Sequence, residues 1–200
     1  MKAILLSVAI LLTLFIVFQS FMILPSTKTE EQKYTVIQKG KDFEIRFYPA
    51  ATIATISSGA KTYKELANPG FRKLAGYIFG GNETDTKISM TAPVYMDIND
   101  SLSSMSFVMP SGYDQTNLPK PNDSGVNIKT TGEQYVAALR FGGFASDKRL
   151  KKYSEKLKSL LESQGIITKG NYKYLGYNPP FRLVARRNEI VVSVDWEKNK

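Results

Sequence analysis

The chain has 200 residues, a formal net charge of +9 at pH 7, and neither histidine nor cysteine. Without imidazole or thiolate groups, the sequence excludes Ser-His-Asp and Cys-His nucleophiles, disulfides, histidine or cysteine metal sites and iron–sulfur clusters. We therefore expect a function based on shaped apolar surface and fixed positive charge.

The first element is an apolar run from Ala3 to Leu24, preceded by Met1 and Lys2. As a helix it would span about 33 Å, against roughly 30 Å for the hydrocarbon core of a bilayer. A cleavable signal peptide is the alternative, but its apolar region is usually only about 7–15 residues long. We predict an uncleaved signal anchor over residues 1–25, which would place the domain on the exported side, periplasmic or extracellular. Cleavage of this leader would instead give a secreted protein.

Residues 26–33 are polar and predict a short tether, so that residues 34–200 would form one domain with its own core. The domain is net positive, which favours solubility and attraction to anionic lipid headgroups beside the anchor. Anionic small ligands are a further explanation of this charge. We expect no nucleic-acid partner, because the basic residues are dispersed and no recognition motif accompanies them.

Strands are expected early in the domain. Phe43, Ile45 and Phe47 alternate with more polar residues, among them Arg46 and Tyr48, which predicts a half-buried strand. Further extended segments of the first half are expected at residues 34–38, 50–57, 88–98 and 105–109.

A helix interrupts these strands. Its apolar face has the spacing i, i+3, i+4 and i+7 and consists of Phe71, Leu74, Ala75 and Ile78. Asn68 as the N-cap and Pro69 in the first turn predict its start. Gly80 and Gly81 predict its end.

The second half repeats this order. Strands are expected at residues 126–131, 134–141, 172–177 and 189–195. A long amphipathic helix from Asp147 to about Ser163 separates them in pairs, with Ser146 as its cap and Gly165 as its end. Two consecutive strand-strand-helix-strand-strand units predict an α+β fold of two pseudo-symmetric halves, forming a twisted antiparallel sheet or distorted barrel flanked by two helices.

Catalytic motifs are absent or incomplete. Ser58 to Lys61 matches the Ser-x-x-Lys pattern of penicillin-interacting enzymes, but the Ser-Asp-Asn and Lys-Thr-Gly elements that accompany it are missing. Asp97 and Asp100 flank a turn-like Asn99, which favours a solvated turn over a paired-carboxylate site. We therefore predict no catalytic residues and no metal site.

Another set of strings has a specific order along the domain. They are FEIRFYPA at 43–50, KISMTAPV at 87–94, SFVMP at 106–110, LPKP at 118–121, RFGGFA at 140–145, GYNPP at 176–180 and RRNEI at 186–190. Together they resemble the SOUL family of haem-binding proteins from about Tyr34 to Val194. The resemblance implies two pseudo-symmetric halves and non-catalytic binding of haem or a related tetrapyrrole in an exposed apolar cleft near the first helix. Some members are thought to use an axial histidine, which this sequence lacks. The resemblance therefore implies binding through apolar contacts and basic residues, or through a weaker Met, Tyr or Lys ligand.

The candidate binding residues follow from what a porphyrin requires, an apolar wall with cations near its two carboxylates. They are Phe71, Leu74, Ala75 and Ile78 as wall, Arg72 at the border of the helix, and Phe181 and Arg182 from the loop after Pro180. Each has a simpler interpretation, because a helical apolar stripe also suits a core and an arginine also suits solvent. The string from Arg186 to Glu189 favours a structural polar network that ties the last loop to the sheet.

The sequence thus predicts a membrane-anchored carrier, buffer or sensor of a tetrapyrrole. The alternative is a binding module for another amphipathic or anionic small molecule, because fold-level kinship does not fix the ligand. An enzyme would need an acid–base pair that the sequence does not visibly provide.

Overall fold

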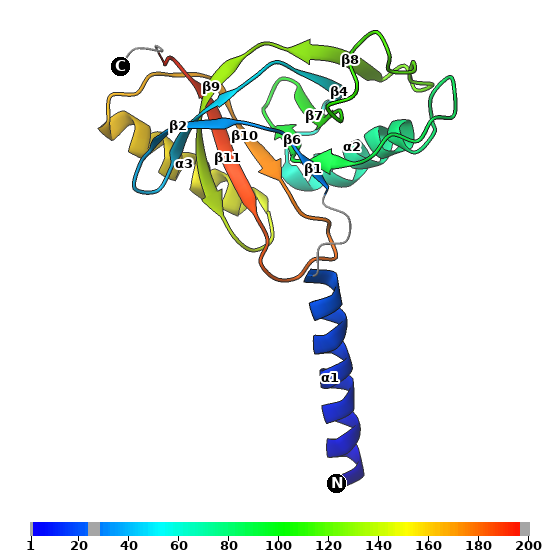
Figure 1. The fold of residues 1–200 in the computed structure, drawn as a ribbon. Helices are drawn as coiled ribbons and strands as arrows, with labels where there is room; N and C mark the ends of the chain where they lie inside the picture. Colours follow the sequence, from blue (N-terminus) through cyan, green and yellow to red (C-terminus); the bar gives the residue numbers. More distant parts are fainter. Residues whose placement is uncertain (1, 24–28, 197–200) are drawn as a thin grey trace.

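The computed structural model describes residues 2–23 and 29–196 (Figure 1). Its helices are α1 (Lys2–Ile23), α2 (Tyr63–Ile78) and α3 (Asp147–Ser163). Its strands are β1 (Glu30–Glu31), β2 (Thr35–Lys39), β3 (Glu44–Tyr48), β4 (Ala51–Ser58), β5 (Thr91–Ala92), β6 (Val94–Asp97), β7 (Ser103–Val108), β8 (Val126–Thr131), β9 (Gln134–Phe141), β10 (Thr168–Gly176) and β11 (Asn188–Val194). Residues 24–28 of the predicted anchor and tether, and residues 197–200 of the predicted domain, lie outside the described residues.

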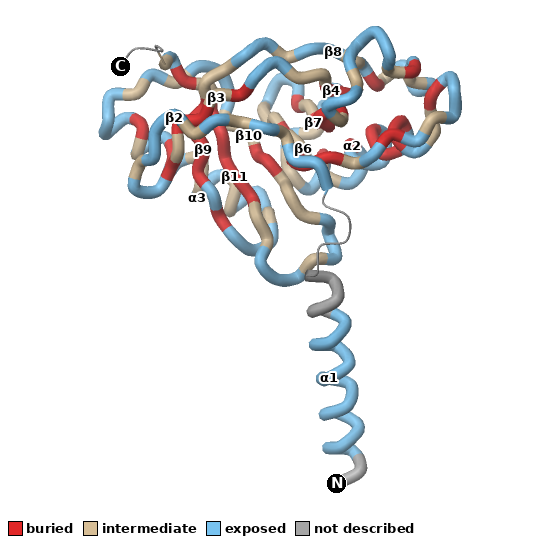
Figure 2. The backbone as a smooth tube through the Cα atoms, in the orientation of Figure 1, coloured by how far each residue is buried: buried red, intermediate tan, exposed pale blue. Residues whose placement is uncertain are grey.

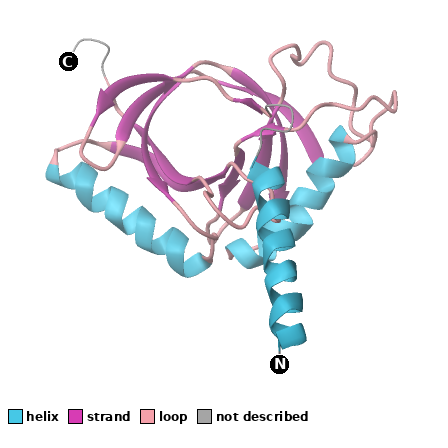
Figure 3. Cartoon of the chain, turned by 60° about the horizontal axis from the view of Figure 1, so that its bottom comes forward, coloured by secondary structure: helices cyan, strands magenta, loops and turns pink. Residues whose placement is uncertain are grey.

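Nine strands form one antiparallel sheet in the order β2-β3-β9-β11-β10-β6-β7-β4-β8. The sheet does not close, since β2 and β8 remain its two edges. Figure 3 shows the strands curving around an interior, with α2 and α3 on the outside. The predicted α+β class, the twisted antiparallel sheet and the two flanking helices are confirmed.

The two predicted halves of the fold exchange strands within the sheet. The first half is β3-β4-α2-β6-β7 and the second is β8-β9-α3-β10-β11. The first strand of each half pairs with the other half, β3 with β9 and β8 with β4, while β6 and β10 pair at the centre. Because each half completes the sheet of the other, we expect the two halves to fold as a single cooperative unit.

The core has two layers, one on each face of the sheet. The outer layer lies between the strands and the helices, where Leu157 and Leu161 of α3 are fully buried. The inner layer is smaller and includes Tyr48, Val136 and Leu175. Figure 2 shows the buried positions concentrated on the strands and on the helix faces toward them. In the described chain the buried hydrophobic residues run from Phe43 to Val194, so this core is built without α1.

The N-terminal helix α1 extends away from the sheet in Figure 1, and its side chains at positions 4–18 are exposed. Within the described ranges, no helix meets both the length and the apolarity that a membrane crossing requires. Part of the predicted tether is attached to the domain. Glu30 and Glu31 pair with β5 as parallel strands, and the Gln32 N–H donates to the Ala92 carbonyl at 2.8 Å.

The predicted start of the first helix is wrong. The helix α2 begins at Tyr63, where the Thr62 hydroxyl caps it by accepting from the Glu65 N–H at 3.2 Å. Pro69 therefore lies inside the helix instead of in its first turn. A proline there lacks the N–H for an i−4 bond and disfavours the helix locally, so the packing of α2 against β4 and β7 has to outweigh that cost.

The half-buried interpretation of the strand at 43–48 is also wrong. Arg46 and Tyr48 on β3 are 4% and 1% exposed, although their alternation with Ile45 suggested a solvated face. The curvature of the sheet encloses this face, so it becomes the inner layer of the core. The predicted strand at 88–98 divides at Pro93 into β5 and β6.

We expect Leu157→Ala to lower the free energy of unfolding by about 2–5 kcal/mol, because it deletes a fully buried side chain that joins α3 to the sheet. The neighbouring Lys158→Ala is the matched control and should stay within about 0.5 kcal/mol of wild type. Urea unfolding of both variants, followed by Trp196 fluorescence, measures this. Equal effects of the two substitutions would contradict the assigned orientation of α3.

Candidate functional site

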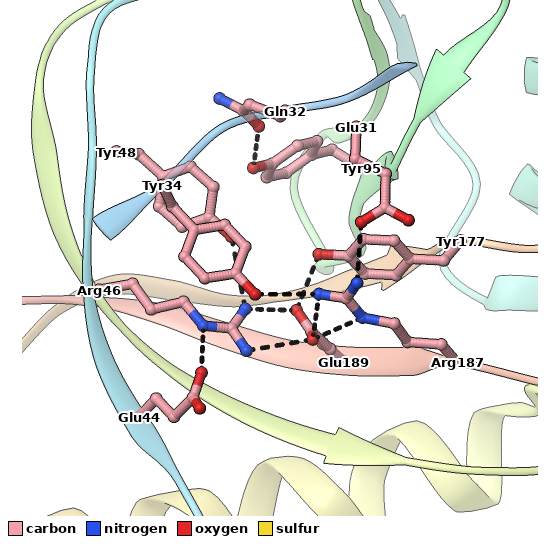
Figure 4. A network of polar contacts seen from close by, with 10 residues as sticks. All are labelled: Glu31, Gln32, Tyr34, Glu44, Arg46, Tyr48, Tyr95, Tyr177, Arg187 and Glu189. Atoms are coloured by element: carbon pink, nitrogen blue, oxygen red, sulfur yellow. Dashed lines mark hydrogen bonds and ion pairs between the residues drawn. The ribbon is translucent and has the colours of Figure 1, made fainter. Parts of the chain in front are cut away.

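The inner face of the sheet contains a buried polar network (Figure 4). Glu189 on β11 is 0% exposed, and its carboxylate accepts hydrogen bonds from both Nη atoms of Arg46, at 2.7 and 3.2 Å. On its other side it accepts from Nε of Arg187 at 3.0 Å and from the Tyr177 hydroxyl at 2.9 Å. The carboxylate of Glu189 thus lies between two guanidinium groups, which explains how a charge is tolerated at full burial.

Aromatic rings surround these charges. The guanidinium of Arg46 lies 4.3 Å from the ring centroid of Tyr34, and that of Arg187 lies 3.7 Å from that of Tyr177. Both distances suit cation–π contacts. Although burial alone would raise the pKa of Glu189, the hydrogen bonds and charges of Arg46 and Arg187 outweigh it and hold that pKa below its usual value.

The network leaves little free space inside the curved sheet. The void lined by Tyr48, Tyr95, Val136 and Val191, among others, measures about 20 Å³. That volume is about enough for one water molecule. This void is far too small for a planar macrocycle, which favours the outer surfaces of the domain for a ligand of that size.

The outer surface offers an unusual loop between β10 and β11, residues 177–187. Arg186 braces it, because its Nη1 donates to the carbonyls of Pro179 at 2.9 Å and Arg182 at 2.7 Å. The same guanidinium lies 4.7 Å from the ring centroid of Phe144 in the β9–α3 connection. Ala185 has a φ of +52°, a left-handed conformation that alanine rarely adopts, so these contacts hold a strained turn.

This bracing leaves large apolar side chains in solvent. We define the loop patch as the four exposed residues Phe144, Phe181, Leu183 and Val184, whose exposures range from 43% to 60%. Arg182 lies among them, half-buried, with its Nε donating to the Val184 carbonyl at 3.3 Å. Three of these residues lie on one loop and Phe144 lies in the connection that Arg186 contacts; exposed apolar residues gathered in this way indicate a binding surface more than isolated ones do.

The loop patch is close to the first turn of α2. Burial raises the pKa of Tyr63, and the positive charge of Arg186 partly offsets that rise, which places Arg186 near this phenol. The first turns of α2 and α3 are hydrogen-bonded to each other, because the Tyr63 backbone N–H donates to a carboxylate oxygen of Asp147. The side-chain Nε of Arg186 is buried and has no hydrogen-bond partner in the described parts of the chain.

The structure separates the predicted binding residues. Leu74 and Ile78 are fully buried in the core beneath α2, and Ala75 is 9% exposed. Phe71 lies at the helix border, with its ring centroid 5.3 Å from that of Phe107, and Arg72 is exposed. Phe181 and Arg182 lie on the loop patch instead. Contact of these residues with a ligand stays a prediction.

Sequence reasoning missed Phe144, Leu183, Val184 and Arg186 as parts of one surface. The available signal was the apolar content of a loop that is also rich in Pro and Asn. The predicted polar network from Arg186 to Glu189 is confirmed for three of its members. Arg187 and Glu189 belong to the inner network, and the Asn188 side-chain amide donates to the Gly143 carbonyl at 2.7 Å.

Comparison with known proteins agrees with this fold. The sequence profile described as SOUL heme-binding protein matches residues 29–193. Heme-binding protein 2 of Mus musculus is 31% identical over 175 residues, covering 84% of this chain and 83% of the relative. Heme-binding protein 2 of Homo sapiens is 33% identical over 156 residues, covering 74% and 76%. Heme-binding protein 1 of Xenopus laevis is 29% identical and covers 80% of this chain and 90% of its own.

Two solved structures show the same fold at low sequence identity. The crystal structure of the EcmrR C-terminal domain has a TM-score of 0.57 at 9% identity, covering 82% of this chain and 99% of the other. That of a hydrolase from Listeria innocua has a TM-score of 0.52 at 10% identity, covering 80% and 94%. At this identity the likeness shows the architecture and nothing about activity.

We expect Glu189→Gln to lower the free energy of unfolding at pH 7 by about 3–5 kcal/mol, because it removes the buried counter-charge that Arg46 and Arg187 share. Glu44→Gln is the matched control, since Glu44 also accepts from Arg46, at 2.8 Å, but its side chain is 30% exposed. We expect at most about 1 kcal/mol for it.

The same pair of variants gives a pH dependence. A glutamate with a lowered folded-state pKa stabilises fully above its unfolded value of about 4.3 and loses that contribution as the pH falls through the folded value. The difference between wild type and Glu189→Gln in denaturant unfolding should therefore shrink below about pH 4. A difference that grows with acidification would refute the assignment of Glu189 as ionised.

Proposed function

Because the chain belongs to the SOUL family of heme-binding proteins, we propose that its domain binds haem or a related tetrapyrrole as a carrier, buffer or sensor, without catalysing a reaction. Two observations support this proposal. The family profile spans residues 29–193, which include both helices of the domain and all its strands except the last residue of β11. The loop patch supplies an exposed apolar surface with arginines at its edge.

The proposed contact surface is the loop patch together with the first turn of α2. A tetrapyrrole is a flat apolar disc with carboxylates at one edge, so it needs an apolar wall and nearby cations. Phe144 and Phe181 would provide the wall, and Arg182 would face the carboxylates. Arginine suits this role because its planar guanidinium donates two parallel hydrogen bonds to one carboxylate.

The residues of this surface suit a tetrapyrrole through apolar and charged contacts. Coordination of its iron by histidine or cysteine is excluded, because the chain has neither residue. Bound haem would supply an iron centre, while this chain's residues would contribute shape, charge and exclusion of water from one face of the macrocycle. Phe71 and Arg72 offer a second accessible face on α2, with Leu74, Ala75 and Ile78 supporting it from the core.

Haemin titration of the full-length chain in detergent micelles tests the proposal. We expect a saturable change in haemin absorbance at one equivalent, which empty micelles do not produce. Arg182→Glu should weaken the affinity about tenfold or more, since a charge-assisted contact contributes about 1.5–3 kcal/mol and the variant adds repulsion.

Two control variants locate the surface. Lys158→Glu reverses an exposed charge on α3, outside the loop patch, and should leave the affinity unchanged. Arg72→Glu reports on the face of α2 and should have less effect than Arg182→Glu. No saturable change with wild type would overturn the binding proposal, and an effect confined to Arg72→Glu would move the site to α2.

We also propose that the N-terminal segment anchors the protein and that the domain lies on the exported side of the membrane. This rests on the sequence of residues 1–25 and on the exposure of twelve large apolar side chains between Ile4 and Phe18. Exposed apolar surface of this extent needs a covering environment. Retention of the leader distinguishes an anchored protein from a secreted one.

Extraction of cell membranes with alkaline carbonate tests the anchor. The full-length chain should stay in the membrane pellet, with its N-terminal residues present by intact mass spectrometry. Leu11→Arg should release it into the soluble fraction or prevent export, because an arginine placed in the hydrocarbon core of a bilayer costs about 2.5–3.5 kcal/mol. Ile167→Arg, at an exposed apolar position of the domain, is the matched control and should not change the fractionation. Release of the wild-type chain would overturn the anchor.

A further inference from the structure

The loop patch lies at the end of the domain where the chain leaves toward α1 (Figure 1). The strand β10 runs into the loop at Gly176, which pairs with Val94 just after β5. Ala92 of β5 pairs with Glu31 of β1, the strand that follows α1 in the chain. The end of the loop also contacts this strand directly, because Nη1 of Arg187 lies 2.9 Å from the Glu31 carboxylate. The strand register and the ion pair thus hold the loop beside the point where the chain enters the domain.

The connection between α1 and the domain is short. Seven residue steps separate Ile23, the last residue of α1, from Glu30, the first residue of β1. An extended chain covers at most about 3.3–3.6 Å per residue, so these steps span no more than about 25 Å. With α1 across a bilayer and Ile23 at its surface, β1 stays within about that distance of the lipid. The loop patch, held beside β1, is therefore confined to the neighbourhood of the headgroups.

The segments that carry the patch are net positive. Residues 177–187 contain three arginines and no acidic residue, and residues 140–149 contain three basic residues and one acidic residue. That acidic residue, Asp147, accepts the Tyr63 backbone N–H. Arg140 and Lys148 are exposed. A basic surface of this kind attracts anionic lipid headgroups.

The apolar side chains of the patch are presented to the outside. Phe181 is 60% exposed and Phe144 is 51% exposed, and phenylalanine is among the residues that interfacial segments bury at the headgroup boundary. Because Arg186 donates to the carbonyls of Pro179 and Arg182, the loop is already ordered and would lose little conformational freedom on docking. A braced apolar tip with basic flanks suits the surface of a bilayer.

We propose that the loop patch docks against the lipid bilayer that holds α1. Its four apolar side chains lie in the headgroup region, and Arg182 pairs with a lipid phosphate. The proposal rests on the anchor proposed above and does not depend on haem binding. Lipid and tetrapyrrole would compete for the same side chains, so a bound tetrapyrrole would release the domain from the membrane surface.

Fluorescence quenching by brominated lipids tests the docking. The chain has no cysteine, so a single cysteine introduced into the full-length chain carries a bimane label at one site. The protein is reconstituted in vesicles of phosphatidylcholine and phosphatidylglycerol with brominated acyl chains. We expect quenching of a label at Val184→Cys and none at Leu102→Cys. Leu102 is also apolar and exposed, but it lies in the connection from β6 to β7, at the opposite end of the β6–β10 pair.

A third label separates the docking from the anchor, because Leu11→Cys reports whether α1 lies in the lipid. Quenching at Leu11 without quenching at Val184 would overturn the docking, keep the anchor and leave the patch to a soluble ligand or a second copy of the chain. Absence of quenching at all three sites would overturn both proposals. Equal quenching at Val184 and Leu102 would also overturn the docking, since the domain would then lie on the membrane without a preferred face.

Paired substitutions show which surface touches the lipid. With the label at Val184→Cys, Phe181→Asp should reduce the quenching severalfold, because it places a carboxylate among anionic headgroups. Phe181 is largely exposed, so this substitution should not disturb the fold. Ile167→Asp is the matched control. It changes an exposed apolar residue just before β10, at the end of that strand away from the loop, and should leave the quenching unchanged. Equal quenching in the two variants would contradict the docked orientation.

Discussion

The ion pair between Arg46 and Glu189 is the constraint on which the interior of this domain depends. The two residues are 143 positions apart and lie on β3 and β11, with β9 between them. Strands two places apart in a sheet are separated by about 10 Å, so the long Arg46 side chain reaches Glu189 across β9 on the inner face of the sheet. Arg187 and Tyr177 complete the hydrogen bonding that allows the charges to stay buried. Since this network and its tyrosines fill the inner face, binding is left to the outer surfaces.

The exchange of strands between the halves explains where those outer surfaces lie. Because β6 and β10 pair at the centre, neither helix fully covers them, and a groove beside α3 opens over this pair. At one end of the sheet, the loop between β10 and β11 meets the connection from β9 to α3 through Arg186 and Phe144. The duplicated fold thus leaves two differently lined surfaces, one at the seam of the halves and one at the tip of a loop.

Local sequence patterns predicted most of the helices and strands. They missed the features that depend on contacts between residues far apart in the sequence. The helix α3 begins and ends where Ser146 and Gly165 indicate, and β8 and β9 match their predicted ranges. The start of α2 was misplaced because Asn68 and Pro69 form a convincing local signal, whereas the Thr62 cap and the packing that retains Pro69 are not visible in the pattern. Arg46 was assigned to the less buried face of its strand because it alternates with apolar residues. Alternation distinguishes the two faces of a strand, but it does not show that the polar face is buried by a contact with Glu189, 143 residues away.

The candidate site was predictable only in part, for a related reason. Phe181 and Arg182 were chosen from composition and are found on an accessible loop, but Leu74 and Ile78 follow the spacing of a helix face that the core itself uses. Which cations flank a loop depends on how that loop folds. Arg186 donates hydrogen bonds to carbonyls of its own loop, whereas the neighbouring Arg182 lies beside the apolar side chains. No spacing rule in the sequence distinguishes these two roles.

Binding at an open surface without a coordinating imidazole has an energetic consequence. A macrocycle on the loop patch would bury one face and leave much of the other in water, so its apolar stabilisation would be well below that of an enclosed pocket. The arginine contacts would be partly solvated and screened by salt. Such a complex exchanges its ligand readily, as a carrier or buffer must, whereas a permanent prosthetic group needs the enclosed volume that the inner network of this protein occupies.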